Sequence, residues 1–160
     1  MTHRTDLETA LLTSDGAARD MNFEAPRWEG IAALLEPLEE QLVEANSLDG
    51  DGAPIATPIW ASIEAATKDA DMVHLSYRPN VGPIRQLQVF VFREGDGSPF
   101  IELTFFPEDV TPVEHLETAF RDWAQRVTDT LKARRCFCRH ENASWRFGDV
   151  GPGSGVFLVI

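Results

Sequence analysis

A chain of 160 residues with 43% hydrophobic content and ten phenylalanines can build one packed domain, which excludes an intrinsically disordered chain. Its formal net charge of −12 argues against direct binding of nucleic acid, because phosphate recognition depends on Lys and Arg. Nowhere do about 18 apolar residues run together, and the start MTHRTDLETALL lacks the basic and apolar regions of a signal peptide, so we expect a cytoplasmic protein without a membrane segment.

The negative charge is concentrated in the N-terminal part of the chain. Residues 1–71 carry 4 Lys and Arg against 15 Asp and Glu, whereas residues 72–160 carry 10 against 11. A local excess of this kind produces a field that attracts a basic partner. The alternative interpretation is that the acidity only keeps the protein in solution.

The first half of the chain predicts one long helix that is interrupted by a proline. Residues 1–20 are expected to be loosely ordered or to form a short helix. Leucine and isoleucine recur at helical spacing over residues 26–45, and Pro37 predicts a kink or break near Leu35 or Glu36. Residues 57–67 alternate in polarity, which favours a strand over a short helix.

The second half predicts strands around one secure helix. The segments MVHLSY, IRQLQVFVF and FIELTFF predict a three-stranded antiparallel meander, with the hairpin loop EGDGSP between the last two. A helix is predicted over residues 111–135, where Thr111 and Glu114 form a capping box and Pro112 is the first helical residue.

The segments RCFCRHE, SWRF and GVFLVI predict the closing strands, with the loop GDVGPGSG before the last. Together the elements predict a single α+β domain over residues 1–160. It is expected to contain a mainly antiparallel sheet of five to six strands, on which two main helices pack.

The stretch FIELTFFPEDV at residues 100–110 raises the question of a catalytic carboxylate set. Side chains alternate along a strand, so Leu103 and Phe105 are expected in the core and Glu102 on the opposite face. Glu108 and Asp109 precede the predicted helix, whose positive end favours carboxylates. Because nothing in this spacing separates two carboxyl pKa values, we interpret the three residues as structural and predict no catalytic residues.

Cys136, Cys138 and His140 lie on one face of a predicted strand and suggest a zinc site. Three successive residues on one strand face are too far apart to converge on one tetrahedral ion, so a buried cysteine pair is expected instead. The glycines of GDVGPGSG have neither a following Lys nor a helix, so they do not form a phosphate loop. No metal or cofactor is therefore predicted, although a small hydrolase using one of these cysteines with a histidine stays open.

The remaining candidate is an acidic helix surface. Glu36, Glu40 and Glu44 follow each other at i, i+4 opposite the leucine stripe, and like charges at that spacing destabilise a helix. Such a surface is either merely solvated or complementary to a basic partner. The candidate partner-binding residues are Glu29, Glu36, Glu39, Glu40, Glu44, Asp49, Asp51, Glu102, Glu108 and Asp109.

Two stretches, DGAARDMNFEAPRWEGIAALL at residues 15–35 and FIELTFFPEDV, resemble small bacterial immunity proteins that accompany polymorphic toxins of the contact-dependent or secreted type. The resemblance implies a non-catalytic protein that binds a cognate toxin domain and occludes or distorts its active site. It also implies a basic toxin partner, since many such toxins act on nucleic acid, and a monomer or weak dimer. The residues that contact the toxin vary between such pairs, so the resemblance transfers no site.

A second class of binding protein also fits the sequence. Type III secretion chaperones are small, acidic, α+β and usually dimeric, and they bind a segment of a secreted effector. A constitutive homodimer that binds an unfolded segment would favour the chaperone, whereas a monomer that binds one folded toxin domain would favour the immunity protein.

Overall fold

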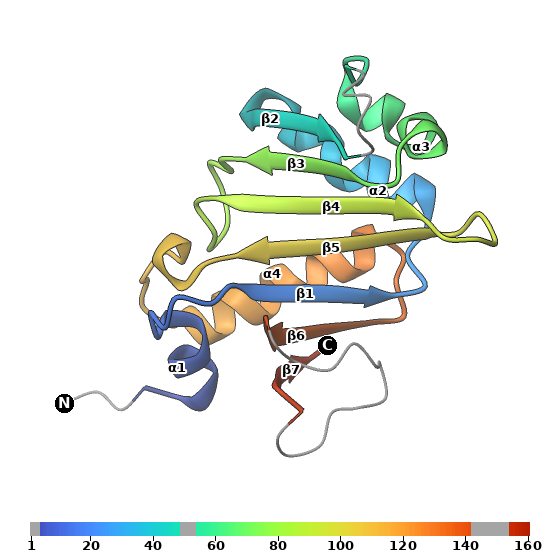
Figure 1. Cartoon of the computed structure of the whole chain (residues 1–160). Helices are drawn as coiled ribbons and strands as arrows, with labels where there is room; N and C mark the ends of the chain where they lie inside the picture. Colours follow the sequence, from blue (N-terminus) through green and yellow to red (C-terminus); the bar gives the residue numbers. More distant parts are fainter. Residues whose placement is uncertain (1–3, 49–53, 142–153) are drawn as a thin grey trace.

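A seven-stranded antiparallel sheet with the strand order β2-β3-β4-β5-β1-β6-β7 forms the frame of the protein in the computed structural model (Figure 1). The structure describes residues 4–48, 54–141 and 154–160. The strands are β1 Arg19–Glu24, β2 Leu42–Ser47, β3 Val73–Tyr77, β4 Leu87–Arg93, β5 Pro99–Phe105, β6 Arg135–His140 and β7 Val156–Val159.

The helices pack on one face of this sheet, where α2 and α4 pass behind the strands in Figure 1. The helical segments are α1 Asp6–Leu12, α2 Trp28–Leu35, the 3₁₀ segment η1 Glu36–Gln41, α3 Ile59–Asp69, the 3₁₀ segment η2 Pro107–Asp109 and α4 Leu116–Thr130. The predicted α+β class is confirmed, with seven strands in place of five to six and four α-helices in place of two.

The predicted meander is confirmed as β3, β4 and β5, which pair in chain order. Val89, Val91 and Leu103 are fully buried on the helix-covered face, and the side chains between them are half-buried on the other face. Strands β6 and β7 are also confirmed. The predicted strand at residues 144–147 and the loop residues 148–153 lie outside the described residues.

Two predictions for the N-terminal half are wrong, and one is confirmed. Residues 59–69 form helix α3 instead of a strand, because Ile59, Ile63 and Thr67 are buried at helical spacing. The long helix does break at Leu35, as predicted, but after the proline-containing segment η1 the chain continues as the edge strand β2. The short helix expected within residues 1–20 is confirmed as α1, with a capping box between Thr5 and Glu8, and strand β1 begins at Arg19.

The C-terminal helix begins later than predicted. Helix α4 starts at Leu116, after His115 in a left-handed conformation with φ of 59°. The expected capping box at Thr111 is absent because the backbone amide of Thr111 donates to the carbonyl oxygen of Pro83 at 2.8 Å. The neighbouring bridge between Ile84 and Val110 holds this segment extended.

Candidate partner-binding surfaces

The predicted row of three glutamates does not exist as one surface. Glu36 and Glu40 are exposed on η1, a 3₁₀ segment in which residues four apart do not align. Glu44 lies on β2, paired with Ser76 of β3. The physical reason is the early end of the helix near Pro37, which places the third glutamate on a sheet edge.

Two other predicted residues already have partners within the protein. Glu29 lies 3.7 Å from Arg27 and 3.6 Å from Lys132, and a hydrogen bond from its own backbone, with these cations, lowers its carboxyl pKa. Glu39 accepts a hydrogen bond at 3.2 Å from the backbone amide of Trp60 in the first turn of α3. Both contacts have local structural roles.

Glu108 and Asp109, which follow the strand FIELTFF, lie in a segment that is held by contacts with other parts of the chain. Glu108 accepts a hydrogen bond from Ser14, which lowers its carboxyl pKa, and its backbone oxygen accepts from Arg85 at 2.6 Å. Burial raises the pKa of Asp109. They precede the helix, as predicted, but they lie in η2 and α4 begins only at Leu116, so the positive end of that helix does not explain them. Asp49 and Asp51 lie outside the described residues.

Glu102 belongs to a polar cluster on the sheet face that no described helix covers. Its Oε2 atom accepts from Asn22 Nδ2 at 2.8 Å, and the hydroxyl of Thr104 donates to Asp20 Oδ1 at 2.8 Å. The strand register places Arg139 opposite Asp20. The predicted facing of this strand is confirmed, since Leu103 and Phe105 are buried on the other side.

Burial dominates the electrostatics of this polar cluster. It raises the pKa values of Asp20 and Glu102, and it lowers the pKa of Arg139, which both carboxylates partly restore. Asn22 is only 3% exposed, and its Oδ1 atom accepts no hydrogen bond within the described part of the chain. Because the two carboxyl pKa values are raised by the same cause, the cluster lacks the acid and base separation of a catalytic pair.

Asp20 and Asn22 are not among the predicted site residues, because no strand is predicted from the sequence at this position. The signal was present as a period of two in Arg19, Met21 and Phe23, which all face the helices. This period is hard to recognise in the sequence, because charged residues lie on both faces of β1.

The two cysteines are buried thiols on the helix-covered face, as predicted. Cys136 and Cys138 are both 0% exposed, and their sulfur atoms lie 3.9 Å apart. Burial, with the neighbouring thiol, raises the pKa of Cys138. A reactive thiol needs the opposite conditions, namely exposure and a lowered pKa. Across the described ranges, no group of three or more His, Cys, Asp or Glu residues could hold a metal ion.

An apolar groove lies on the helix side, between η1, the β3–β4 loop and α4. It has a volume of about 240 Å³ and is lined by Leu34, Leu38, Val81 and Trp123, among others. Gly82, with φ of +90°, brings the loop backbone against the Trp123 ring, where a Cβ atom would lie 3.3 Å from Cδ1. The groove continues into a shallower hollow of about 350 Å³ that includes Val113 and Asp122.

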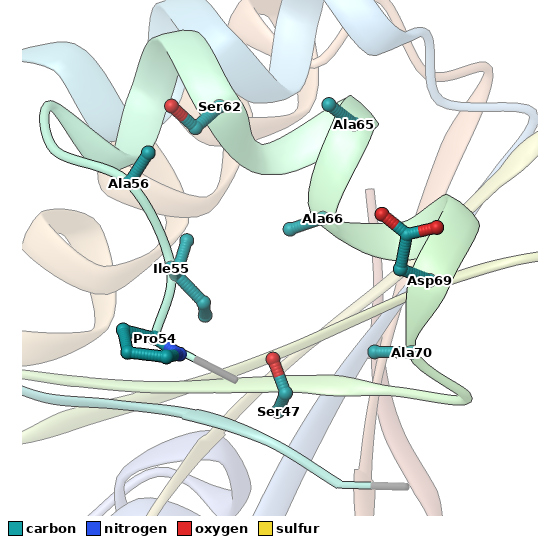
Figure 2. A pocket seen from close by; sticks show the side chains of 9 residues that line it. All are labelled: Ser47, Pro54, Ile55, Ala56, Ser62, Ala65, Ala66, Asp69 and Ala70. Carbon is teal, nitrogen blue, oxygen red and sulfur yellow. The ribbon is translucent and has the colours of Figure 1, made fainter. Parts of the chain in front are cut away.

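Two further cavities lie near strand β2. Figure 2 shows the first, of about 250 Å³, where small side chains of α3 face Ile55 and Ser47, with Asp69 at one side. The second, of about 310 Å³, brings Glu44 and Asp109 together at the ends of the strands, with Arg78 among its lining. Both are at or below the lower end of small-molecule sites, which span roughly 300–1,000 Å³.

No helix in the described ranges is long and apolar enough to span a bilayer. No protein-family model matches the chain, and no curated protein matches it. The fold is similar to that of a chain in the 1.75 Å crystal structure of the toxic C-terminal tip of CdiA from Pseudomonas aeruginosa in complex with immune protein. That match has a TM-score of 0.54 and 11% identity, and it covers 89% of this chain and 94% of the other. At this identity the likeness is one of fold.

Proposed function

We propose that this protein is a non-catalytic binding protein that neutralises a cognate toxin domain. The observation that carries the proposal is the fold likeness to a chain of a toxin and immune-protein complex, which extends over 89% of this chain. Fold likeness alone does not determine function, so the proposal also draws on the chemistry of the surface.

The charge distribution supports the immunity protein over the toxin as the counterpart of this chain. Residues 1–71 carry 4 Lys and Arg against 15 Asp and Glu, and Glu36 and Glu40 are exposed on η1. A field of this sign accelerates the capture of a basic protein. The burial of Cys136 and Cys138 is a second support, because it removes the thiols that a small hydrolase would need.

The test is co-expression with the candidate toxin domain that is encoded beside the gene. The toxin domain alone should arrest growth of a bacterial host, and this protein should restore growth and co-purify with the folded domain in a 1:1 complex. Growth arrest by this protein alone would refute the proposal, and so would the absence of both protection and complex formation. A constitutive homodimer that binds an unfolded effector segment would identify the chaperone instead.

A further inference from the structure

From the geometry of the apolar groove we infer that it is the docking site for one apolar side chain of a basic protein partner, flanked there by Lys or Arg. This inference rests on the proposed function and adds to it a surface and a partner chemistry. It differs from the sequence-based hypothesis, in which the acidic residues alone formed the contact.

The first observation is the exposure of apolar side chains at this groove. Val81 is 75% exposed on the β3–β4 loop, and Val113 is 46% exposed beside the adjoining hollow. Contiguous exposed apolar surface with a polar rim is typical of protein interaction sites. By contrast, Asp20 and Asn22 in the polar cluster of the sheet are 6% and 3% exposed, which leaves little of them for a partner to contact.

The second observation is that the groove is already formed. The loop backbone at Gly82 rests on Trp123, and the Trp123 ring packs at 5.6 Å from the buried Phe120 ring. A preformed site loses little conformational entropy on binding. Its volume of about 240 Å³ is below the range of small-molecule clefts, which favours a single side chain as the occupant.

The third observation is the charge of the rim. The η1 residues Pro37 and Leu38 line the groove, and the exposed Glu36 and Glu40 flank them in the chain. Asp122 lines the adjoining hollow, and Arg126 lines both the groove and the hollow. The three carboxylates outnumber this cation, so the surface around the groove is net negative and is complementary to Lys or Arg next to the docked side chain.

The same charges argue against a second copy of this chain as the occupant. In a two-fold dimer the same surface patch lies on both subunits, so the acidic rims would face each other. With a net charge of −12, the two copies also repel at long range.

The experiment measures binding of the toxin domain to two matched pairs of variants. Val81→Asp is compared with Val43→Asp, which changes a 55% exposed valine of edge strand β2 that lies outside the groove. Glu40→Lys is compared with Glu44→Lys, because both are exposed glutamates but only Glu40 is next in the chain to a groove-lining residue, Gln41. All four positions are exposed, and circular dichroism checks that each variant is folded.

Val81→Asp should raise the dissociation constant at least about tenfold, as expected for a side chain at a binding hot spot, and Val43→Asp should change it less than about twofold. Glu40→Lys should slow association several-fold at low salt more than Glu44→Lys does, and the difference should fade at high salt. If the wild-type protein binds and Val81→Asp binds equally well, the groove is refuted while the proposed function stands. If the wild-type protein does not bind the toxin domain, the groove and the proposed function are both refuted. If this chain forms a dimer that Val81→Asp dissociates, the choice of a basic partner as the occupant is refuted.

Discussion

Replacement of Arg19 by Met should destabilise the protein more than the loss of an ordinary ion pair. The Arg19 side chain is 1% exposed, and its guanidinium donates to the carbonyl oxygens of Ala10 at 2.7 Å, Thr13 at 3.0 Å and Ala17 at 3.0 Å. It also donates to both carboxylate oxygens of Asp15, at 3.1 and 3.2 Å. One guanidinium therefore ties the end of α1 and the following loop to strand β1.

The expected cost follows from these contacts. A hydrogen bond to a charged group contributes about 1.5–3 kcal/mol net, and breaking a fully buried ion pair costs about 3–5 kcal/mol. Asp15 is 43% exposed and regains water when Arg19 is removed, so the cost should lie near the lower end, at about 3 kcal/mol. For a domain of this length that lowers the melting temperature by roughly 6–12 °C.

Thermal and urea unfolding followed by circular dichroism measure this cost, with Asp15→Asn as the matched control. Asp15→Asn removes the charge but leaves the carbonyl contacts of Arg19, so it should lower the melting temperature far less than Arg19→Met. Arg19→Lys keeps the charge without the planar fork and should fall between them. Equal losses for Arg19→Met and Asp15→Asn would refute the reasoning, because the ion pair alone would then explain the effect.

Three further changes test the core and the polar cluster. Gly30→Ala should destabilise the protein by about 1–3 kcal/mol in urea unfolding, because its Cβ would lie 2.5 Å from a backbone oxygen at the end of α4; Gly95→Ala, with no atom within 4 Å, is the control and should be tolerated. Burial raises the pKa of Glu102, so its contribution to stability is complete below its unfolded pKa and is lost as pH rises through the higher folded value. The stability of Glu102→Gln relative to wild type should therefore increase as the pH is raised from 4 to 7. A difference in unfolding free energy that does not change with pH would contradict this. Cys136→Ser and Cys138→Ser should lose stability but retain toxin binding when folded, and both native thiols should react slowly with a thiol reagent near neutral pH.

The elements with a clean period were predictable from the sequence, and those that depend on distant partners were not. The meander alternates polar and apolar residues, and β6 and β7 are rich in strand-forming types. Strand β1 appears polar in the sequence because it contains the buried Asp20 and Asn22. These residues form hydrogen bonds with Thr104 and Glu102, at sequence separations of 84 and 80. No local pattern reveals such a pairing.

The predictions for the segments that form strand β2 and helix α3 were wrong for a related reason. The segment LVEANS of β2 contains good helix formers, and it becomes a strand because it pairs with β3 at the edge of the sheet. In α3, alternation over a few residues resembled a strand, whereas burial of Ile59 and Ile63 against the neighbouring helix set the helical period. In both cases tertiary contacts outweighed local preference.

The error in β2 also changes how the acidic residues must be tested. If Glu36, Glu40 and Glu44 lay on one helix, reversing all three to Lys would test one surface. In the structure Glu44 pairs with Ser76 and lines a cavity with Asp109, while Glu36 and Glu40 are on η1 beside the apolar groove. The triple variant would therefore alter two surfaces at once, and a slower association could come from either.

Single reversals remove this ambiguity, because long-range attraction and direct contact depend differently on position. Attraction by the whole field is screened over about 8 Å at physiological ionic strength and responds to net charge, so Glu40→Lys and Glu44→Lys should slow association equally if only the field matters. A contact at the groove predicts that Glu40→Lys also speeds dissociation, because a charge pair at the interface affects the dissociation rate. Association and dissociation rates measured for the two variants at low and moderate salt distinguish these cases. Equal effects on both rates would leave the field as the whole contribution of the acidic residues, whereas faster dissociation for Glu40→Lys alone would place that carboxylate at the interface.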